Sequence, residues 1–293
     1  MFQKKMLKTR VAIIGAGPAG IACAIQLKRS KIAFLIFERE KPGGLLRNAN
    51  FVENYPGFPD GIKGEKLVAL FQQQLQNNKI NIIKESVERV KYEKTFLIET
   101  SKNIYQSEFL VVASGTKPRM LDLEIPQAAN FRIFYEIIKI KKLKNSRIAI
   151  IGAGDAGFDY ALSLSKKNKV WILDRAEKPK CLPSLFDKCM KNQRIVYLKN
   201  FAVTGVRFID NNLILSSDNR TLSVDYMVVA IGREPNLDFL EQYTIKSLEG
   251  NKKLYMIGDV KNGPFRQTAI AVGDGIKAAM EISRMSLNYE GNQ

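Results

Sequence analysis

The feature that most constrains the fold is a unit that occurs twice, in residues 10–39 and 147–175. The copies begin with the apolar stretches R-V-A-I-I and R-I-A-I-I, followed directly by G-A-G-P-A-G and G-A-G-D-A-G. Each copy continues with the pattern of an apolar-faced helix and ends in a second apolar stretch that closes on an acid, Glu38 or Asp174. A strand, a glycine-rich turn, a helix and a second strand form a β-α-β unit, so the fold class is predicted to be α/β.

The spacing inside each unit indicates what it binds. The turns have the form G-x-G-x-x-G, and the acids follow the first glycines by 23 and 22 residues. The first glycine permits the tight turn, the second lets a diphosphate approach the backbone at the helix N-terminus, and the third packs the helix on the strand. The acid accepts hydrogen bonds from a ribose. The chain is therefore predicted to contain two Rossmann-like dinucleotide-binding domains, with candidate contacts at Gly15, Gly17, Pro18, Ala19, Gly20, Glu38 and Arg39, and at Gly152, Gly154, Asp155, Ala156, Gly157, Asp174 and Arg175.

A second duplication gives the domain order. Residues 109–119 and 226–236 share Val-Val-Ala, a glycine and a proline, and each is expected to contain the last strand of a domain. Pro118 and Pro235 then mark crossings between domains. A strand expected at residues 254–257 and a helix expected at 268–285 are too short for a third domain, so they are predicted to complete the first. The predicted domains are 1–117 with 236–293, and 118–235 inserted between them.

Composition excludes several kinds of chemistry. The chain has no histidine, so it has neither a Ser-His-Asp or Cys-His catalytic group nor an imidazole metal ligand. Its three cysteines, Cys23, Cys181 and Cys189, form no C-x-x-C pair, and no metal site is expected. The chemistry is therefore expected to belong to a bound cofactor.

The chain is strongly basic, with 46 Lys and Arg against 29 Asp and Glu and a formal charge of +17. A solvated basic surface, docking of an acidic partner, and binding of nucleic acid or lipid all stay open on this evidence. The densest run, residues 139–144 (K-I-K-K-L-K), is not interleaved with aromatics as in single-strand binders, so no nucleic-acid partner is expected. The uncharged run 11–25 after a basic start mimics a secretory signal, but its glycines and proline would break the required helix. No other stretch approaches a membrane span, and a cytoplasmic protein is expected.

With two such units and a split first domain, the sequence resembles the two-dinucleotide-binding flavoproteins, in particular the small thioredoxin reductase-like branch, over nearly its whole length. The resemblance implies FAD in the first domain, NAD(P)H in the inserted one, a homodimer, and rotation of the domains about the crossings near Lys117-Pro118 and Glu234-Pro235. Hydride would pass from the nicotinamide to the flavin, and electrons would then leave to a second acceptor.

The resemblance also carries over individual residues. Residues 42–46 (P-G-G-L-L) resemble the family segment G-G-Q-L, with Leu45 replacing the glutamine, and residues 52–59 (V-E-N-Y-P-G-F-P) resemble V-E-N-x-P-G near the isoalloxazine. Ala113-Ser114-Gly115 stands where relatives have A-T-G. The further cofactor contacts that the resemblance implies are Gly43, Gly44, Leu45, Asn54, Ala113, Ser114, Gly115, Gly232, Gly258, Asp259, Arg266, Gln267 and Thr268.

One departure from that branch concerns the redox dithiol. Thioredoxin reductases carry a C-x-x-C pair shortly before the second glycine turn, but residues 130–146 contain no cysteine, so thioredoxin reduction by the usual route is not expected. Tyr135-x-Ile137 with the following turn instead resembles the ferredoxin/flavodoxin–NADP reductases of thioredoxin-reductase type, without their long C-terminal extension. Cys181 and Cys189 are expected to be surface or half-buried thiols, and Cys23 is expected to pack on the sheet.

The sequence therefore predicts an FAD-dependent NAD(P)H oxidoreductase whose acceptor is an acidic ferredoxin- or flavodoxin-type carrier. Alternatives are reduction of a small molecule such as a low-molecular-weight disulfide, a flavin-binding subunit without turnover, and a basic nucleic-acid binder built on the same fold. NADH is expected to be preferred over NADPH, because Asp174-Arg175-Ala176 replaces the His-Arg-Arg cluster of NADPH-using relatives and an ionised Asp repels a 2′-phosphate. Arg175, Lys178 and Lys180 would soften that repulsion.

Overall fold

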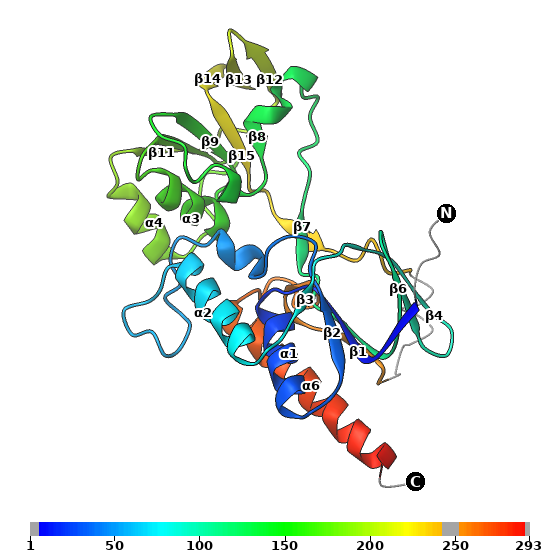
Figure 1. Ribbon diagram of the computed structural model, residues 1–293. Helices are drawn as coiled ribbons and strands as arrows, with labels where there is room; N and C mark the ends of the chain where they lie inside the picture. The colour runs from blue at the N-terminus through cyan, green and yellow to red at the C-terminus, as the bar shows by residue number, and fades with distance from the viewer. Residues whose placement is uncertain (1–5, 242–251, 291–293) are drawn as a thin grey trace. The chain divides into compact units, whose positions relative to one another are not determined.

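The computed structural model describes residues 6–241 and 252–290, which belong to two units (Figure 1). Unit 1 consists of Met1–Arg47, Glu53–Lys117 and Pro235–Gln293, and unit 2 consists of Asn48–Val52 and Pro118–Glu234. Parts of the predicted first domain, residues 1–5, 242–251 and 291–293, lie outside the described residues. The prediction of an α/β chain with one Rossmann-type unit inserted in another is confirmed. The assignment of FAD and NAD(P) to the two units stays a prediction.

Unit 1 is built on a sheet with the strand order β3-β2-β1-β6-β5-β4. The strands are β1 (Met6–Ile14), β2 (Phe34–Phe37), β3 (Ile82–Ile83), β4 (Val87–Tyr92), β5 (Phe96–Thr100) and β6 (Ile104–Val112). Strands β3, β2, β1 and β6 are parallel, whereas β5 and β4 continue the sheet antiparallel. The first copy of the repeat therefore forms the parallel half of this sheet.

The late strand β17 (Leu254–Met256) belongs to the sheet of unit 1. Strand β6 pairs with β5 along its first half and with β17 along residues 110–112, where Leu254 lies opposite Leu110. The residues of β6 in this second half are fully buried, which explains why the sequence there is a continuous apolar run. The 3-10 turn η4 (Gly258–Val260) follows β17.

Helices cover one face of this sheet. They are α1 (Pro18–Arg29), α2 (Gly64–Asn77) and α6 (Thr268–Glu290), and a short 3-10 turn, η1 (Gly44–Arg47), precedes α2. One core joins the inner faces of α1 and α6 and the end of α2 to the sheet through Leu27, Leu75 and Ile282. A second core lies on the other face and contains Phe37, Phe96 and Tyr105. Phe37 and Tyr105 meet edge to face with their ring centroids 4.8 Å apart.

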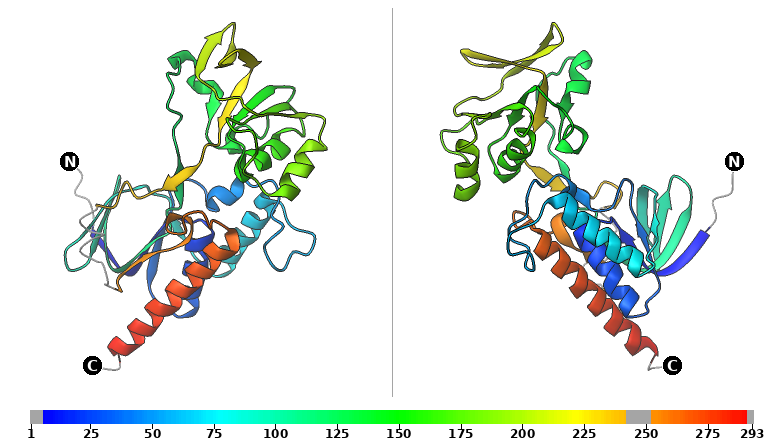
Figure 2. Two further views of the ribbon diagram at one scale, coloured as in Figure 1. Left: turned by 180° about the vertical axis from the view of Figure 1, so that it is seen from behind. Right: turned by 60° about the vertical axis from the view of Figure 1, so that its left-hand side comes forward.

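Helices α1 and α6 run side by side in both views of Figure 2, although 238 residues separate their ends in the chain. They come very close at Gly275, where an added Cβ would overlap the carbonyl oxygen of Ala19 and lie 2.9 Å from the amide nitrogen of Cys23. Gly273, two residues earlier on α6, has open space at the corresponding position. The backbones of α1 and α6 can touch only because residue 275 has no side chain.

Unit 2 contains a parallel sheet with the order β11-β10-β9-β15-β8. The strands are β8 (Ile133–Phe134), β9 (Arg147–Ile151), β10 (Lys169–Leu173), β11 (Ile195–Leu198) and β15 (Tyr226–Val229). Helices α3 (Asp155–Leu164) and α4 (Pro183–Met190) and the turn η3 (Ile137–Lys139) pack on one face. The antiparallel meander β12 (Gly205–Ile209), β13 (Asn212–Ser217) and β14 (Arg220–Val224), with η2 (Gln127–Arg132), packs on the other.

Two connections join the units, and they pair with each other as the short strands β7 (Thr116–Pro118) and β16 (Arg233–Pro235). These strands contain both prolines that the sequence marks as crossings. The segment Asn48–Val52 is grouped with unit 2, which the sequence did not predict. The Asn48 side chain accepts a hydrogen bond from the Ile138 amide (3.0 Å), and the Asn50 amide donates to Asp159 (2.8 Å).

None of the helices in the described ranges combines the length and apolar character that a bilayer crossing needs.

The contrast between Gly275 and Gly273 gives a matched test of the α1–α6 contact. Gly273→Ala should raise the free energy of unfolding by about 0.5–1 kcal/mol, because alanine is the better helix former and its Cβ enters open space. Gly275→Ala should lower it by roughly 1–3 kcal/mol, because its Cβ would push α6 off α1. Urea unfolding of both variants followed by circular dichroism measures the difference. Equal effects of the two substitutions would contradict this account of the contact.

Candidate functional site

The first glycine turn lies at the carboxyl end of β1, directly before α1. Gly15 has φ +104°, and a Cβ there would overlap the carbonyl oxygen of Ala113 at the end of β6. A Cβ on Gly20 would overlap the carbonyl oxygen of Gly15. The first and third glycines are therefore required by contacts within the protein itself: one with the neighbouring strand, the other between helix and turn.

Gly17 differs from its two neighbours in the motif. Its backbone is extended (φ −76°, ψ −178°), and a Cβ there would meet nothing within 4 Å. It is the N-cap of α1 and provides no side-chain hydrogen bond to the first turn, and Pro18 follows it. Protein packing does not require glycine at this position, whereas close approach of an anionic group to the N-terminus of α1 does. This cradle fits the diphosphate of a dinucleotide.

Glu38 and a glycine segment hold the first turn in place. The Glu38 carboxylate accepts hydrogen bonds from the amides of Ala16 and Glu40, both at 2.9 Å. The Gly43 amide donates to the Ala16 carbonyl (2.8 Å), and a Cβ on Gly44 would lie 3.3 Å from the Cα of Gly17. The acid that follows β2 and the backbone of Gly43-Gly44 thus both contact the turn.

The second turn, at the carboxyl end of β9, repeats this geometry. Gly152 has φ +113° and faces the carbonyl oxygen of Ala230, and Gly157 faces that of Gly152. Gly154 is again the N-cap of its helix, and a Cβ there would make only an ordinary contact, 3.8 Å from the Lys180 carbonyl oxygen. The Lys180 amide donates to the Ala153 carbonyl at 3.0 Å. Lys180 and Gly43 each come 28 residues after the first glycine of their turn, so the repeat extends beyond the part visible in the sequence.

Asp174, the acid of the second unit, is buried at the end of β10. Its carboxylate accepts hydrogen bonds from the Ala176 amide (2.9 Å) and from the Tyr197 hydroxyl (2.8 Å). Burial, together with the hydrogen bond to Asp174, raises the pKa of Tyr197, so this hydroxyl stays a donor. Tyr197 on β11 fixes the carboxylate, and no sequence signal pointed to it.

Other predicted site residues of unit 1 each form a hydrogen bond or a close contact with a residue distant in sequence. The Asn54 side-chain amide donates to the Gln267 side-chain oxygen at 2.9 Å, joining residues 213 positions apart. The Ser114 hydroxyl donates to the Asn236 carbonyl at 2.6 Å. Gly258 has φ +73°, and a Cβ there would lie 2.8 Å from the Cβ of Ala19 on the first turn of α1.

Asp274 on α6 is a further organising residue. Its carboxylate accepts hydrogen bonds from the Gly258 amide (3.0 Å) and the Asn262 side chain (2.7 Å), and it pairs with Lys261 at 3.3 Å. It therefore fixes the Gly258-Asp259 turn against the start of α6. The predicted site residues did not include Asp274, although an acid between two glycines in a helical pattern (V-G-D-G-I) is a detectable signal.

The predicted site residues thus lie in two groups, one in each unit, and their roles as ligands stay predictions. Contacts given above join the larger part of the first group to the first turn: Gly15, Gly17, Pro18, Ala19, Gly20, Glu38, Gly43, Gly44, Ala113 and Gly258. Arg39 is exposed after Glu38, Leu45 lies in η1, Gly115 follows β6, Asp259 lies in η4, and Arg266 and Thr268 lie at the start of α6. The second group is Gly152, Gly154, Asp155, Ala156, Gly157, Asp174 and Arg175, and Gly232 lies between β15 and β16.

The cysteines differ partly from expectation. Cys23 is buried against the sheet as predicted, and Cys181 is half-buried as expected, but Cys189 is fully buried rather than at the surface or half-buried. Its side chain lies on the inner face of α4 and donates to the Phe158 carbonyl at 3.5 Å. Burial raises the pKa of the Cys23 and Cys189 thiols to about 12 each, and burial with the charges of Asp155 and Asp174 raises that of Cys181. All three thiols are therefore poor nucleophiles at neutral pH.

Within the ranges described, no group of three or more Cys, Asp or Glu side chains is placed to hold a metal ion.

Comparisons with known proteins agree with this geometry. A family model described as pyridine nucleotide-disulphide oxidoreductase matches residues 9–275. The chain is 29% identical to a thioredoxin reductase of Rickettsia prowazekii, with 95% of this chain and 98% of the relative covered. It is 26% identical to a solved thioredoxin reductase of T. acidophilum, with a TM-score of 0.84 and coverage of 96% and 99%. A bacillithiol disulfide reductase from Staphylococcus aureus, 21% identical, shares the fold with a TM-score of 0.75 and coverage of 97% and 99%. The expected likeness to thioredoxin reductase-like flavoproteins is confirmed.

The two middle glycines allow a reciprocal test of the two turns. Gly17→Val should give folded but colourless protein, because the new side chain enters the space where a diphosphate would approach α1. Gly154→Val should keep the flavin but lose its reduction by NADH. Absorbance at 450 nm gives the flavin occupancy, anaerobic mixing with NADH gives the reduction, and circular dichroism checks the fold. Full flavin occupancy in Gly17→Val would show that the first turn does not hold FAD.

Proposed function

The chain belongs to the pyridine nucleotide-disulphide oxidoreductase family, and from this premise we propose that it is an NAD(P)H oxidoreductase that passes electrons through FAD to a separate acidic carrier protein. FAD and NAD(P)H are the cofactors that membership in this family implies. The acceptor, the preference for NADH and the residues that hold each cofactor are proposals. So are the homodimer, which the resemblance implies, and the cytoplasmic location.

The observation that carries the proposal is the pair of equivalent glycine turns. In each turn the outer glycines are needed by the protein's own contacts, and the middle glycine is not. Unit 1 would hold the FAD diphosphate at Gly17 and its ribose at Glu38, and unit 2 would hold NAD(P)H at Gly154 and Asp174. Bound FAD would supply the redox chemistry, namely acceptance of a hydride from NAD(P)H and release of electrons to the acceptor.

In this proposal, the chain's own residues bind and orient the two cofactors. Glu38 and Asp174 are held by backbone amides, so each carboxylate keeps its position at the edge of its turn. Asp274 holds the Gly258-Asp259 turn. The hydrogen bond between the side chains of Asn54 and Gln267 fixes two polar groups that the resemblance places near the flavin ring. The N-terminus of α6 would provide donors and a favourable dipole toward negative charge on the ring.

We infer that electrons do not pass through an enzyme dithiol, which distinguishes this chain from a thioredoxin reductase of the usual mechanism. Residues 130–146 contain no cysteine. Of the three thiols elsewhere, Cys23 and Cys189 are fully buried and all three have raised pKa values. The relatives named above are thioredoxin reductases, and thioredoxin stays the first alternative acceptor to test.

The formal charge of +17 favours an acidic carrier as acceptor, because opposite charges steer the two proteins together and raise the on-rate at low salt. A low-molecular-weight disulfide is the alternative acceptor, and a flavin subunit without turnover is the alternative function. Each predicts a different outcome in the assays below.

The preference for NADH can be tested at Asp174. Asp174→Asn should raise the ratio of the NADPH to the NADH efficiency in flavin reduction, because the carboxylate repels a 2′-phosphate. A repulsion of about 1–3 kcal/mol corresponds to a rise of that ratio by roughly 5- to 150-fold. Tyr197→Phe is the matched control, since it removes the hydrogen bond to Asp174 but leaves the charge. Stopped-flow reduction at low coenzyme concentration measures both. Wild-type protein that reacts faster with NADPH would contradict the proposal.

The identity of the acceptor can be tested by varying the salt concentration and by replacing two of the cysteines. Turnover with an acidic ferredoxin or flavodoxin should fall steeply between 50 and about 300 mM salt, while coenzyme-driven flavin reduction changes little. Cys181→Ser with Cys189→Ser should leave turnover intact, because neither thiol takes part. Thioredoxin and a low-molecular-weight disulfide serve as parallel acceptors under the same conditions. Turnover that is independent of salt, or that is lost in the double cysteine variant, would overturn the carrier proposal.

A further inference from the structure

Six cations line one recess of unit 2, and neither glycine turn contributes to it. The recess has a volume of about 640 Å³, and its cationic residues are Lys144, Arg147, Lys166, Lys167, Lys169 and Arg194. Its ten lining residues include no acid and no aromatic residue. A second hollow of about 510 Å³ shares Lys166 and Arg194 and adds Lys188 and Lys191, again without an acid. We call these eight cations together the basic edge.

The basic edge lies at the amino ends of the parallel strands of unit 2. Arg147 and Lys169 are the first residues of β9 and β10, and Arg194 directly precedes β11. The Gly152 turn and Asp174 are at the carboxyl ends of the same strands, five residues or roughly 16 Å away along β9 and β10. The basic edge is therefore separate from the proposed NAD(P)H site.

Three asparagines hold the loops that carry these cations. Asn168 is almost completely buried; its side chain accepts from the Ser146 amide (3.1 Å) and donates to the Leu143 and Leu164 carbonyls (3.0 and 2.9 Å). Asn145 adopts φ +55°, and its amide donates to the Lys167 carbonyl at 2.8 Å. Asn192 accepts from the Arg194 amide (3.0 Å) and donates to the Ser165 hydroxyl (2.9 Å). The backbone beneath the charges is thus fixed by hydrogen bonds.

The cations of the basic edge differ in how far they are neutralised. Arg147 pairs with Asp225 at 2.8 Å, and the Lys166 ammonium donates to the Asn50 side chain at 2.6 Å. In the part of the chain that the structure describes, the ammonium groups of Lys144 and Lys167 make no ion pair and no hydrogen bond, although the Lys144 carbonyl accepts a hydrogen bond from the Ser146 hydroxyl at 3.1 Å. Because the like charges gathered at this edge repel one another, an anionic partner would gain attraction there and would also relieve that repulsion.

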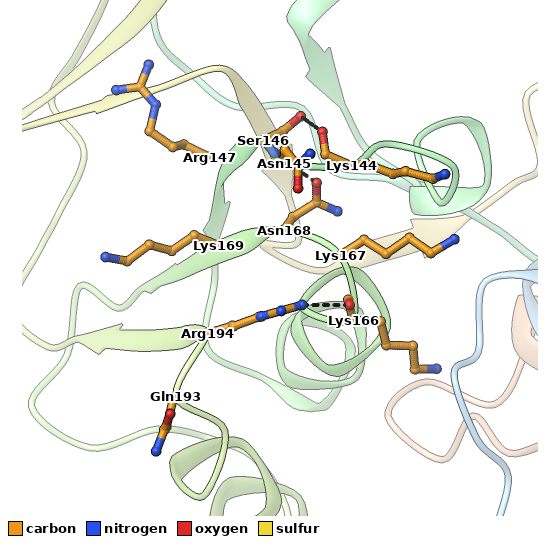
Figure 3. A pocket seen from close by; sticks show the side chains of 10 residues that line it. All are labelled: Lys144, Asn145, Ser146, Arg147, Lys166, Lys167, Asn168, Lys169, Gln193 and Arg194. Atoms are coloured by element: carbon orange, nitrogen blue, oxygen red, sulfur yellow. Dashed lines mark hydrogen bonds between the residues drawn. The ribbon is translucent and has the colours of Figure 1, made fainter.

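The shape of the basic edge favours a broad partner over a small one. Figure 3 shows that the side chains of Lys144 and Lys167 extend in one direction and those of Arg147 and Lys169 in the opposite direction, so they do not converge on a single anion. The Arg194 guanidinium is occupied in part by the Lys166 carbonyl at 2.8 Å. Neither hollow is lined by an aromatic residue on which a nucleobase could stack.

We propose that the basic edge of unit 2 is a docking surface for an acidic protein, with Lys144 and Lys167 as its principal contacts. The proposal rests on the proposed function in one respect, since the acidic electron carrier is the partner it names. Docking here raises the local concentration of the carrier at the enzyme and makes its affinity depend on salt. The densest lysine run in the sequence, residues 139–144, leads directly into this surface.

Charge reversal of two lysines tests the proposal by direct binding. The FAD-loaded full chain is titrated with an acidic [2Fe–2S] ferredoxin by calorimetry at 50 and 300 mM salt. Lys144→Glu with Lys167→Glu should weaken binding by about 10-fold or more at 50 mM salt and flatten the salt dependence. The matched control is Lys66→Glu with Lys102→Glu, which makes the same change of charge at exposed positions of unit 1 and should shift the Kd by less than about twofold.

Further measurements separate the outcomes. Flavin occupancy, melting temperature and NADH-driven flavin reduction should match wild type in both double variants. If the charge-reversed Lys144/Lys167 variant folds poorly, Lys144→Gln with Lys167→Gln replaces it and should give a ferredoxin Kd between those expected for the wild type and the charge-reversed variant. An unchanged ferredoxin Kd in the Lys144/Lys167 variants overturns the proposal, as does failure of the wild type to bind. Loss of binding to a 20-base-pair DNA duplex without loss of ferredoxin binding also overturns it. Ferredoxin that binds through these lysines but is not reduced supports the docking surface and contradicts the proposed function instead.

Discussion

The structure depends on the close contact between the first glycine of each turn and the end of the neighbouring strand. Gly15 lies against the Ala113 carbonyl in unit 1, and Gly152 lies against the Ala230 carbonyl in unit 2. The absence of a side chain at these positions lets the chain leave the sheet and enter a helix within a few residues. As a result, the N-termini of α1 and α3 both lie at the carboxyl ends of parallel strands. Each helix N-terminus therefore presents its unpaired amides at the edge of a sheet where a ligand can reach them.

The same sheet geometry gives unit 2 two ends with different chemistry. At the carboxyl ends of the strands lie the backbone amides of the Gly152 turn and the buried carboxylate of Asp174. At the amino ends lie lysines and arginines on loops fixed by asparagine side chains. Because all five strands of this sheet are parallel, their amino ends lie on one side and their carboxyl ends on the other, and the two sets of residues are kept apart along the strand axis.

The repeat made most of the fold predictable from the sequence. Two glycine turns at matching distances from an acid indicated two Rossmann-type units, and the Val-Val-Ala stretches indicated strands β6 and β15, each of which precedes a crossing between the units. The return of the last strand and helix to unit 1 followed from their shortness. These features are local in sequence or repeat within it, so they can be recognised without coordinates.

Long-range contacts could not be predicted in the same way. The hydrogen bonds from Tyr197 to Asp174 and from the Gly258 amide to Asp274 join elements whose register is set by the folded sheet. The burial of Cys189 follows from which face of α4 packs against Phe158, and a helix of eight residues carries too short a pattern to show that face. The grouping of Asn48–Val52 with unit 2 depends on side-chain partners around residues 136–159, which no local motif marks.

The contact between α1 and α6 at Gly275 has a consequence for the order in which the chain can fold during synthesis. Helix α1 is among the first elements to leave the ribosome, yet the helix that covers it, and strand β17 of its sheet, are made only after the whole of unit 2. Unit 2 is nearly continuous in sequence and can form its core while the chain is still growing. Unit 1 must keep part of an apolar surface uncovered until α6 is released. A folding helper that binds exposed apolar surface would therefore act on the amino-terminal part of this chain for most of its synthesis.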